Sequence, residues 1–346
     1  MRQGAGHDLM NGLRPLPERG RADADAFAAI VAADQPVVLR GQKADWPAVA
    51  AAGQGGEAVA RYIAQFDRGA PVQVMVGPAA INGRFFYRDD WAGFNFTREQ
   101  VPIRALLGEL LRLADTPEAP ALYAGSAPTG EHLPGWAEAN PLDLPLPDAV
   151  ARVWIGNATR VATHYDGSAN LACVVAGKRR FLLFPPDQLP NLYIGPLDRT
   201  MAGQPASLVD PDAPDLKRYP RYAEALRHAM VAELGPGDAI YMPALWWHNI
   251  QAQGPLNVLV NYWSERPGGT SPFVAMVHAL MAVRDLPARE RAVWRAWFDH
   301  YVFNDEAARA ADYLPPAVRG VLGAAAPSRT ERIRQFLLRA LAGPGG

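Results

Sequence analysis

The sequence is poor in cysteine and in net charge. Its single cysteine, Cys173, lies in the apolar stretch LACVVAG, which excludes an internal disulfide and a zinc site built from cysteines. We expect this thiol to be a buried core residue. The formal net charge of −1 gives no overall positive field that would attract nucleic acid or an anionic membrane surface. Nucleic acid is therefore not favoured as a partner.

Long apolar runs are also missing. No stretch approaches the roughly 18 consecutive apolar residues that are typical of a membrane span. The first twenty residues contain no apolar run after a basic region, so no secretory signal is indicated. These absences predict a protein without a membrane partner and favour a cytoplasmic location.

Glycine and proline, in contrast, are abundant and spread along the chain, with 31 and 32 residues. This distribution indicates many short elements joined by turns. Short strand-like runs bounded by Gly, Pro, Asn or Asp are densest in the middle of the chain, at 153–156, 170–176, 179–184, 239–242 and 257–263. Such spacing predicts a mainly β fold, a sandwich or jelly roll, with flanking helices.

The pattern divides the chain into three parts. Residues 1–35 form an N-terminal helical lead-in, and residues 36–268 form the β-rich domain, which also contains a helical pattern at 99–114. Within this domain, residues 185–234 are a long insertion rich in Pro and Asp, with a helix expected at 222–232, that could wall a substrate cleft. Residues 269–346 show only helical periodicity and form a C-terminal appendage.

A candidate metal site lies in the strand-dense region. His164 and Asp166 are two residues apart in THYDGSANL, so in a strand their side chains project from the same face. His248 in LWWHN offers a third ligand. Two imidazoles and one carboxylate leave open positions that suit an Fe(II) oxygenase. The same ligands would also suit Zn(II), Mn(II) or Ni(II) enzymes, so the residues alone leave the metal open.

Three longer segments carry a family resemblance: GNATRVATHYDGSANLACVVAGKRRFLLFPP, LGPGDAIYMPALWWHNI and NVLVNYWSE. They resemble the cupin-like branch of the JmjC-type oxygenases. The resemblance implies a double-stranded β-helix over residues 36–268, with iron held by His164, Asp166 and His248. It further implies Fe(II) as cofactor, 2-oxoglutarate and O₂ as cosubstrates, and hydroxylation of a C–H bond in a protein or peptide side chain. A small-molecule substrate stays open. The C-terminal helices, whose apolar faces must be buried, are expected to form a homodimer, with packing on the chain's own jelly roll as the alternative.

The resemblance also assigns residues to 2-oxoglutarate. Where the family usually has a lysine for the distal carboxylate, this chain has Arg179, with Lys178 as the alternative. Where the family often has a threonine that bonds the same carboxylate, this chain has Val161, with Thr163 nearby. The other residues expected in the cosubstrate pocket are Tyr123, Asn170 and Asn261.

These departures keep two alternatives open. One is a catalytically reduced binding protein that retains the fold, and the other is a Zn(II) or Mn(II) cupin enzyme that does not use 2-oxoglutarate.

Overall fold

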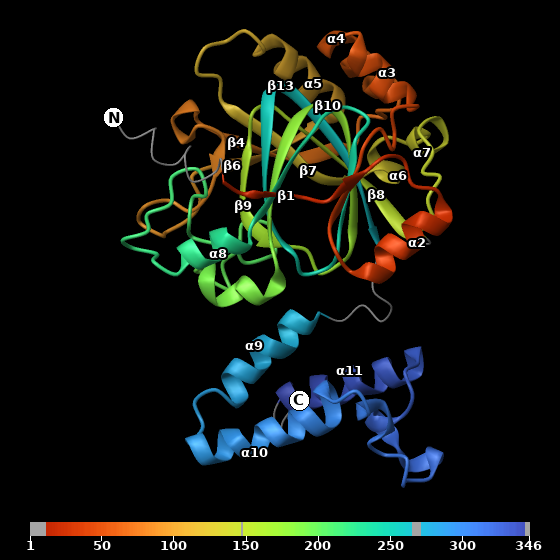
Figure 1. Cartoon of the computed structure of the whole chain (residues 1–346), viewed down its shortest axis with the longest axis vertical. Coiled ribbons are helices and arrows are strands. Elements are labelled where there is room, and N and C mark those ends of the chain that lie inside the picture. The colour runs from red at the N-terminus through yellow and green to blue at the C-terminus, as the bar shows by residue number, and fades with distance from the viewer. Residues whose placement is uncertain (1–11, 147, 265–270, 343–346) are drawn as a thin grey trace. The chain divides into compact units, whose positions relative to one another are not determined.

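The structure, a computed structural model, describes residues 12–146, 148–264 and 271–342 (Figure 1). Internal contacts divide the chain into two units, residues 1–265 and 266–346. Residues 1–11 of the expected lead-in and the expected boundary between residues 268 and 269 lie outside the described residues.

The first unit contains the strands and seven α-helices in its described part. The strands are β1 Arg14–Pro15, β2 Glu18–Arg19, β3 Val37–Leu39, β4 Pro71–Gly77, β5 Arg84–Phe85, β6 Thr97–Pro102, β7 Ala121–Pro128, β8 Ala149–Gly156, β9 Arg160–Tyr165, β10 Asn170–Phe184, β11 Met230–Leu234, β12 Ala239–Met242 and β13 Trp247–Ser264. The helices are α2 Ala24–Ala33, α3 Pro47–Gly53, α4 Gly56–Ala64, α5 Ile103–Arg112, α6 Thr129–His132, α7 Trp136–Ala139 and α8 Tyr222–His228, with 3₁₀ turns η1 Ala79–Ile81 and η2 Pro186–Asn191.

Strands β10 and β13 form the centre of the sheet. They pair antiparallel from their Asn170–Trp263 end to their Phe184–Trp247 end, with register shifts on either side of Ala176. Next to it, Gly177 has a φ of +76°. A Cβ at this position would lie 2.2 Å from the Asn257 Oδ1 atom, so the irregularity requires glycine.

The two halves of β10 and β13 belong to different layers. One half of β10 pairs with β12, and the adjoining half of β13 pairs with β8, which continues through β7 and β4 to β6. The other half of β10 pairs with β11, and the other half of β13 pairs with β9, which pairs with β5. These two layers make a mostly antiparallel jelly roll, so the predicted fold class of a double-stranded β-helix with flanking helices is confirmed.

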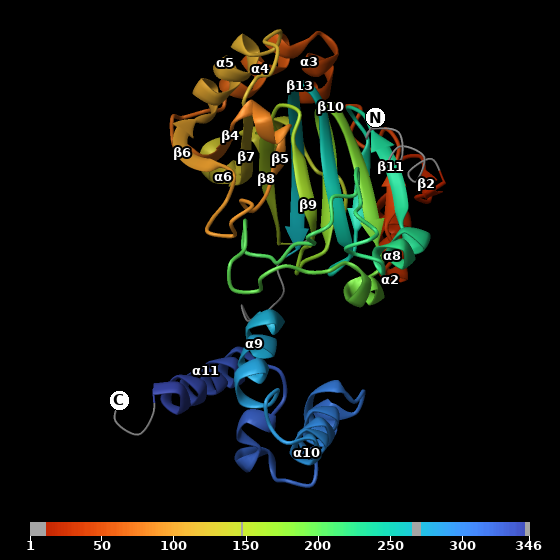
Figure 2. The ribbon, with the colours of Figure 1, turned by 90° about the vertical axis from the view of Figure 1, so that its left-hand side faces the viewer.

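Helices close one end of the jelly roll. Figure 2 shows α3, α4 and α5 together at that end, and they contact one another and the strands β10 and β13. Helix α5 buries Leu106, Leu107 and Leu110 along one side, as expected for an amphipathic helix on a core. Apolar side chains of these helices form one core cluster with the strands. A binding site is therefore expected between the two layers, away from this end.

Two element predictions are corrected by the structure. The helix expected at 99–114 begins only at Ile103, because Thr97–Pro102 is strand β6, paired with β4. Pro102 is the N-cap of α5, and the residue before a proline favours extended backbone. The helix expected at 222–232 ends at His228, and Met230–Leu234 is strand β11. In both cases sheet pairing outweighs local helical pattern.

The second unit is helical in its described residues 271–342. Its elements are α9 Pro272–Ala282, α10 Ala288–Phe298, the π-turn η3 Asp299–Phe303, the 3₁₀ turns η4 Ala307–Arg309, η5 Pro316–Val318 and η6 Gly320–Leu322, and α11 Pro327–Ala342. The expected helical appendage is thus present. Among the residues that the structure describes in either unit, no helix is both long enough and apolar enough to cross a bilayer.

Candidate active site

The three predicted metal ligands meet between the two layers. His164 and Asp166 come from the end of β9 and the residue after it, and His248 lies at the start of β13, directly opposite His164 in the strand pairing. One ligand atom from each residue lies within 4.8 Å of the other two. His248 Nε2 is 3.7 Å from Asp166 Oδ2. The spacing and the antiparallel register together create this cluster.

Backbone contacts orient both imidazoles. His164 Nδ1 lies 2.9 Å from the carbonyl oxygen of Ala162, and His248 Nδ1 lies 3.0 Å from that of Trp246. Since a carbonyl oxygen only accepts hydrogen bonds, each Nδ1 carries the proton and each Nε2 keeps its lone pair. Outer hydrogen bonds of this kind fix the tautomer of metal-binding histidines. The donor set therefore fits a divalent cation with an affinity for nitrogen and oxygen.

The environment keeps His248 uncharged. Burial, with a smaller contribution from the neighbouring His164, lowers the pKa of His248 to about 4, although Asp166 acts in the opposite direction. At neutral pH the imidazole is therefore in the neutral form that binds metal. Asn170 Nδ2 lies 3.4 Å from Asp166 Oδ2, which helps to hold the carboxylate.

Arg179 points into the same cavity as the three ligands, whereas Lys178 does not. The cavity, with a volume of about 640 Å³, is lined by Arg179 and Tyr123 as well as the ligands. Arg179 is only 2% exposed, and its Nε and Nη2 atoms have no hydrogen-bond partner in the described part of the protein. Lys178 is exposed to solvent, because neighbouring residues of a strand face opposite sides. The alternative assignment to Lys178 is thus not supported.

Tyr123 lies beside Arg179. Burial raises the pKa of the Tyr123 hydroxyl, and the nearby guanidinium of Arg179 lowers it. Burial lowers the pKa of Arg179, and Tyr123 opposes that change. An arginine stays protonated even when buried, so the inner end of the cavity holds one positive charge and one phenolic hydroxyl.

The other expected cosubstrate residues divide into two groups. Asn170, Asn261 and Val161 line the cavity, and Asn261 Oδ1 accepts a hydrogen bond from Trp154 Nε1 at 2.8 Å. Thr163 is fully buried but absent from the lining, so its assignment as a cosubstrate residue is not supported. It alternates with His164 on β9, so its side chain faces away when the ligand faces inward.

Several lining residues were not anticipated. The outer walls include Met75 on β4, Trp154 on β8 and Trp263 on β13. Residues 200–204 of the insertion line the cavity on another side, in agreement with the expectation that this insertion walls a cleft. Trp154 could have been found from the sequence, because it alternates with the buried Val153 and Ile155 on β8. The role of residues 200–204 had no such signal, since they lie outside any regular element.

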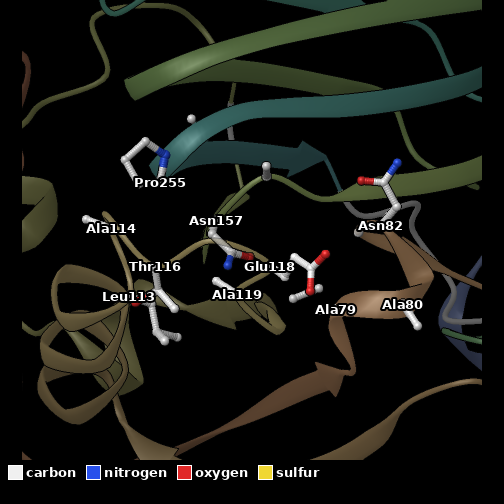
Figure 3. Close-up of a pocket in the computed structure, with 14 residues that line it drawn as sticks. Ala79, Ala80, Asn82, Leu113, Ala114, Thr116, Glu118, Ala119, Asn157 and Pro255 are labelled. Carbon is white, nitrogen blue, oxygen red and sulfur yellow. The ribbon is translucent and has the colours of Figure 1, made fainter.

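A second cavity lies away from the ligands (Figure 3). It has a volume of about 830 Å³, and alanines make up much of its lining, together with Asn82, Glu118 and Asn157. Asn157 already accepts a hydrogen bond from Leu122 N at 3.0 Å and donates one to Pro120 O at 2.8 Å. The metal-binding group found among the described residues is His164, Asp166 and His248, so chemistry is assigned to the smaller cavity.

Comparisons with known proteins agree with this site. The sequence model of a family described as a cupin-like domain matches residues 23–268. A lysine-specific demethylase of Arabidopsis thaliana is 36% identical over 111 residues, which cover 32% of this chain and 20% of that protein. The human bifunctional peptidase and (3S)-lysyl hydroxylase is 36% identical over 136 residues, covering 34% of this chain and 42% of the relative. The tRNA wybutosine-synthesizing protein 5 of Danio rerio is 38% identical over 106 residues, covering 30% and 29%. Each aligned segment spans less than half of the relative.

Proposed function

The chain belongs to the cupin-like domain family of JmjC type, and on that premise we propose that it is a non-haem Fe(II), 2-oxoglutarate-dependent oxygenase. Fe(II) would be held by His164, Asp166 and His248. When bound, the iron would supply the site at which O₂ is activated beside the chelated 2-oxo acid. The reaction we propose is hydroxylation of a C–H bond, with a protein or peptide side chain as the substrate.

Arg179 carries the assignment of the cosubstrate. Its charge is buried, two of its nitrogens lack partners in the described residues, and it shares one cavity with the metal ligands. A buried unpaired charge is strongly destabilising, and a guanidinium can bind a carboxylate through two parallel hydrogen bonds. A dicarboxylate that reaches from the metal to Arg179 would neutralise the buried charge and accept hydrogen bonds from the unpaired nitrogens. The product succinate would still carry the carboxylate that binds Arg179.

The remaining residues of the cavity would position the cosubstrate and exclude water. Met242, Ile250 and Leu259 line the space between the layers, so the cosubstrate would be surrounded by apolar walls. Tyr123 would donate its hydroxyl proton to the distal carboxylate, because burial keeps that hydroxyl protonated. Asn170 and Asn261 offer amide groups to the cavity, and the Asn170 amide lies 3.4 Å from Asp166 Oδ2.

Anaerobic titration of 2-oxoglutarate into the Fe(II)-loaded protein tests this proposal. We expect the weak visible charge-transfer band of a chelated 2-oxo acid, and we expect His248→Ala to abolish it. Binding of metal without a band would favour the catalytically reduced binding protein. Isolation of the protein with tightly bound Zn(II) or Mn(II), and indifference to 2-oxoglutarate, would favour the other cupin-type enzyme.

We also propose that the second unit mediates homodimerisation. Within residues 271–342, Ala311 is the only buried residue, while large apolar side chains such as Trp297 and Phe336 are exposed. An apolar surface of this extent needs a covering partner, and a second copy is the simplest source under two-fold symmetry. Sedimentation at micromolar concentration should give the mass of a dimer. A monomeric mass would refute the proposal.

A further inference from the structure

Arginines outnumber carboxylates in the lining of the active-site cavity. Arg98 on β6 and Arg179 on β10 line the cavity, and Asp166 is the only carboxylate among its described lining residues. Asp166 is also the residue proposed to bind the metal. A ligand that enters from outside would therefore meet no free carboxylate on the described walls.

A third arginine, Arg152, does not line the cavity but contacts two residues that do, Ser126 and Trp263. It lies on β8 two residues before Trp154, which lines the cavity, and it pairs directly with Asn261 on β13. Residues opposite each other in a ladder share one face of the sheet. The Arg152 guanidinium lies 5.3 Å from the centre of the Trp263 ring, so a cation already occupies the aromatic face that would attract a second one.

The bulge beside Arg152 fixes its position. Arg152 Nη1 donates hydrogen bonds to Ser126 O at 3.0 Å and to Ser126 Oγ at 3.3 Å. Ser126 has a φ of +59° and lies where the pairing of β7 with β8 is irregular. Strained residues and bulges of this kind concentrate next to functional sites. Arg152 Nε is buried without a partner among the described residues, so this arginine keeps an unused donor.

Arg98 adds its charge to the cavity wall. Its guanidinium lies 5.0 Å from the ring centre of Phe96, and its Nη2 donates to Met201 O at 2.6 Å. This contact ties β6 to residues 200–204, which line the same cavity. Positive charge is thus present in the wall, through Arg98, and directly behind it, through Arg152.

We infer that this cavity selects a substrate side chain without positive charge, and that Arg152 is the main residue that excludes cations. Like charges in a partly desolvated cavity repel strongly, and no described carboxylate is free to pair with an incoming ammonium group. Neutral or acidic side chains would instead find donors on Ser126 and Gln204, which line the cavity, and a favourable charge on Arg152 behind Ser126. The inference rests on the proposed function. It would distinguish this chain from two relatives whose names refer to lysine.

Ligand-observed saturation-transfer NMR on the Zn(II)-loaded protein with 2-oxoglutarate tests the inference without turnover. The probes are the N-acetyl amides of asparagine, aspartate and lysine. We expect the asparagine and aspartate probes to bind and the lysine probe to bind at least about tenfold more weakly, the effect of one like charge across a partly screened space. Equal binding of all three, binding of none, or preference for lysine would overturn the inference.

Charge reversal tests whether Arg152 causes the discrimination against the lysine probe. Arg152→Glu should reverse the preference toward the lysine probe, and Arg152→Gln should reduce the discrimination in a milder variant. The matched control is Arg112→Glu, which alters an exposed arginine on α5 and should leave the preference unchanged. Unchanged discrimination in a folded Arg152→Gln protein would overturn the role of Arg152. The charge-transfer band tests the proposed function separately, because it reports on iron and 2-oxoglutarate. If the band forms but the protein binds all three probes equally, only the inference about charge selection is contradicted.

Discussion

The two units of the chain use their apolar residues in opposite ways. In the jelly-roll unit, four clusters of buried residues fill the layers and the helical end, and Phe181 and Phe184 are completely buried. In the described part of the C-terminal unit, helices α9, α10 and α11 bury none of their residues. The first unit should therefore provide most of the folding stability and the active site. The helices of the second unit need a further surface to cover their apolar faces. The predictions below test this division.

The single thiol should give the largest contrast. Burial raises the pKa of Cys173 to about 12, whereas a free thiol has a pKa of about 8.5. Since the thiolate is the reactive form, alkylation at pH 8 should be slower than that of a free thiol by a factor of about a thousand or more. In a Cys173→Ala background, Tyr313→Cys in the C-terminal unit should react at the ordinary rate, because Tyr313 is 75% exposed. The alkylation rates of the two proteins can be compared by mass spectrometry.

The same shift predicts a dependence of stability on pH. Because the folded-state pKa of Cys173 is raised, its stabilising contribution is complete below the unfolded value of about 8.5 and is lost as the pH rises toward 12. The free energy of unfolding, measured in urea, should thus fall more between pH 8 and pH 10 for the native chain than for Cys173→Ala. Equal losses in the two proteins would contradict the burial of the thiol.

Removal of large apolar side chains should affect the two units differently. Phe181→Ala should lower the free energy of unfolding by about 3–5 kcal/mol, as expected for a large aromatic residue deleted from a packed core. Phe336→Ala, in a residue that is 58% exposed, should change it by no more than about 0.5 kcal/mol in the jelly-roll unit. Urea denaturation followed by the fluorescence of the buried tryptophans measures both. A comparable loss in the two variants would show that the C-terminal helices share the core.

Much of the fold could be predicted from the sequence, because periodicity reports burial. Strands with buried apolar residues, such as Ala239–Met242, were located within a residue or two. The sequence did not reveal that β10 and β13 each run through both layers. Gly177 looked like a break between two strands of β10, and only residues 257–263 of β13 were predicted as a strand. Strand β6 was missed for a different reason: its residues are mostly exposed and polar, and its pairing with β4 is a long-range property.

The site was predictable where alternation on a strand decides orientation. His164 and Asp166 were found because i and i+2 share a face, and the same rule places Arg179 inside and Lys178 outside once the register is known. The resemblance named the region of Thr163 rather than a face, and the structure leaves this residue outside the cavity lining. Arg152 and residues 200–204 join the site only through tertiary contacts, with Trp263 and with Arg98 respectively, and no local pattern encodes those contacts.

Metal binding should depend on histidines of the first unit only. His248→Ala should weaken binding of Fe(II) or Co(II) by at least about a hundredfold, since loss of even an outer partner of a ligand costs 10–100-fold. His300→Ala, in the C-terminal unit, is the matched control and should leave the affinity unchanged. Anaerobic titration by calorimetry gives both values. An effect of His300→Ala as large as that of His248→Ala would place part of the site in the second unit.

Affinity for 2-oxoglutarate should separate the two neighbouring basic residues of β10. Arg179→Met should weaken binding by about 10–100-fold, because hydrogen bonds to a charged group contribute about 1.5–3 kcal/mol. Lys178→Met changes an exposed residue of the same strand and should alter the affinity by less than about twofold. The intensity of the charge-transfer band against ligand concentration provides the measurement. Similar affinities in the two variants would remove the buried arginine from the cosubstrate site.

The smallest effect concerns an irregularity in β9, whose pairing with β13 shifts register between Val161 and His164 and so separates Val161 from Thr163. Val161 lines the cavity and offers no hydrogen bond, whereas the Thr163 hydroxyl lies outside it without a partner in the described structure. Val161→Thr should therefore tighten 2-oxoglutarate binding by about 2–10-fold, the value of one added hydrogen bond. Thr163→Val removes an unpaired buried hydroxyl, so it should leave 2-oxoglutarate binding nearly unchanged and raise the free energy of unfolding by about 1–3 kcal/mol. The reverse result, with loss of affinity in Thr163→Val and no gain in Val161→Thr, would mean that Thr163 and not Val161 faces the cosubstrate. Because the irregular pairing lets both Val161 and His164 line the cavity, this pair of variants tests the position of that bulge.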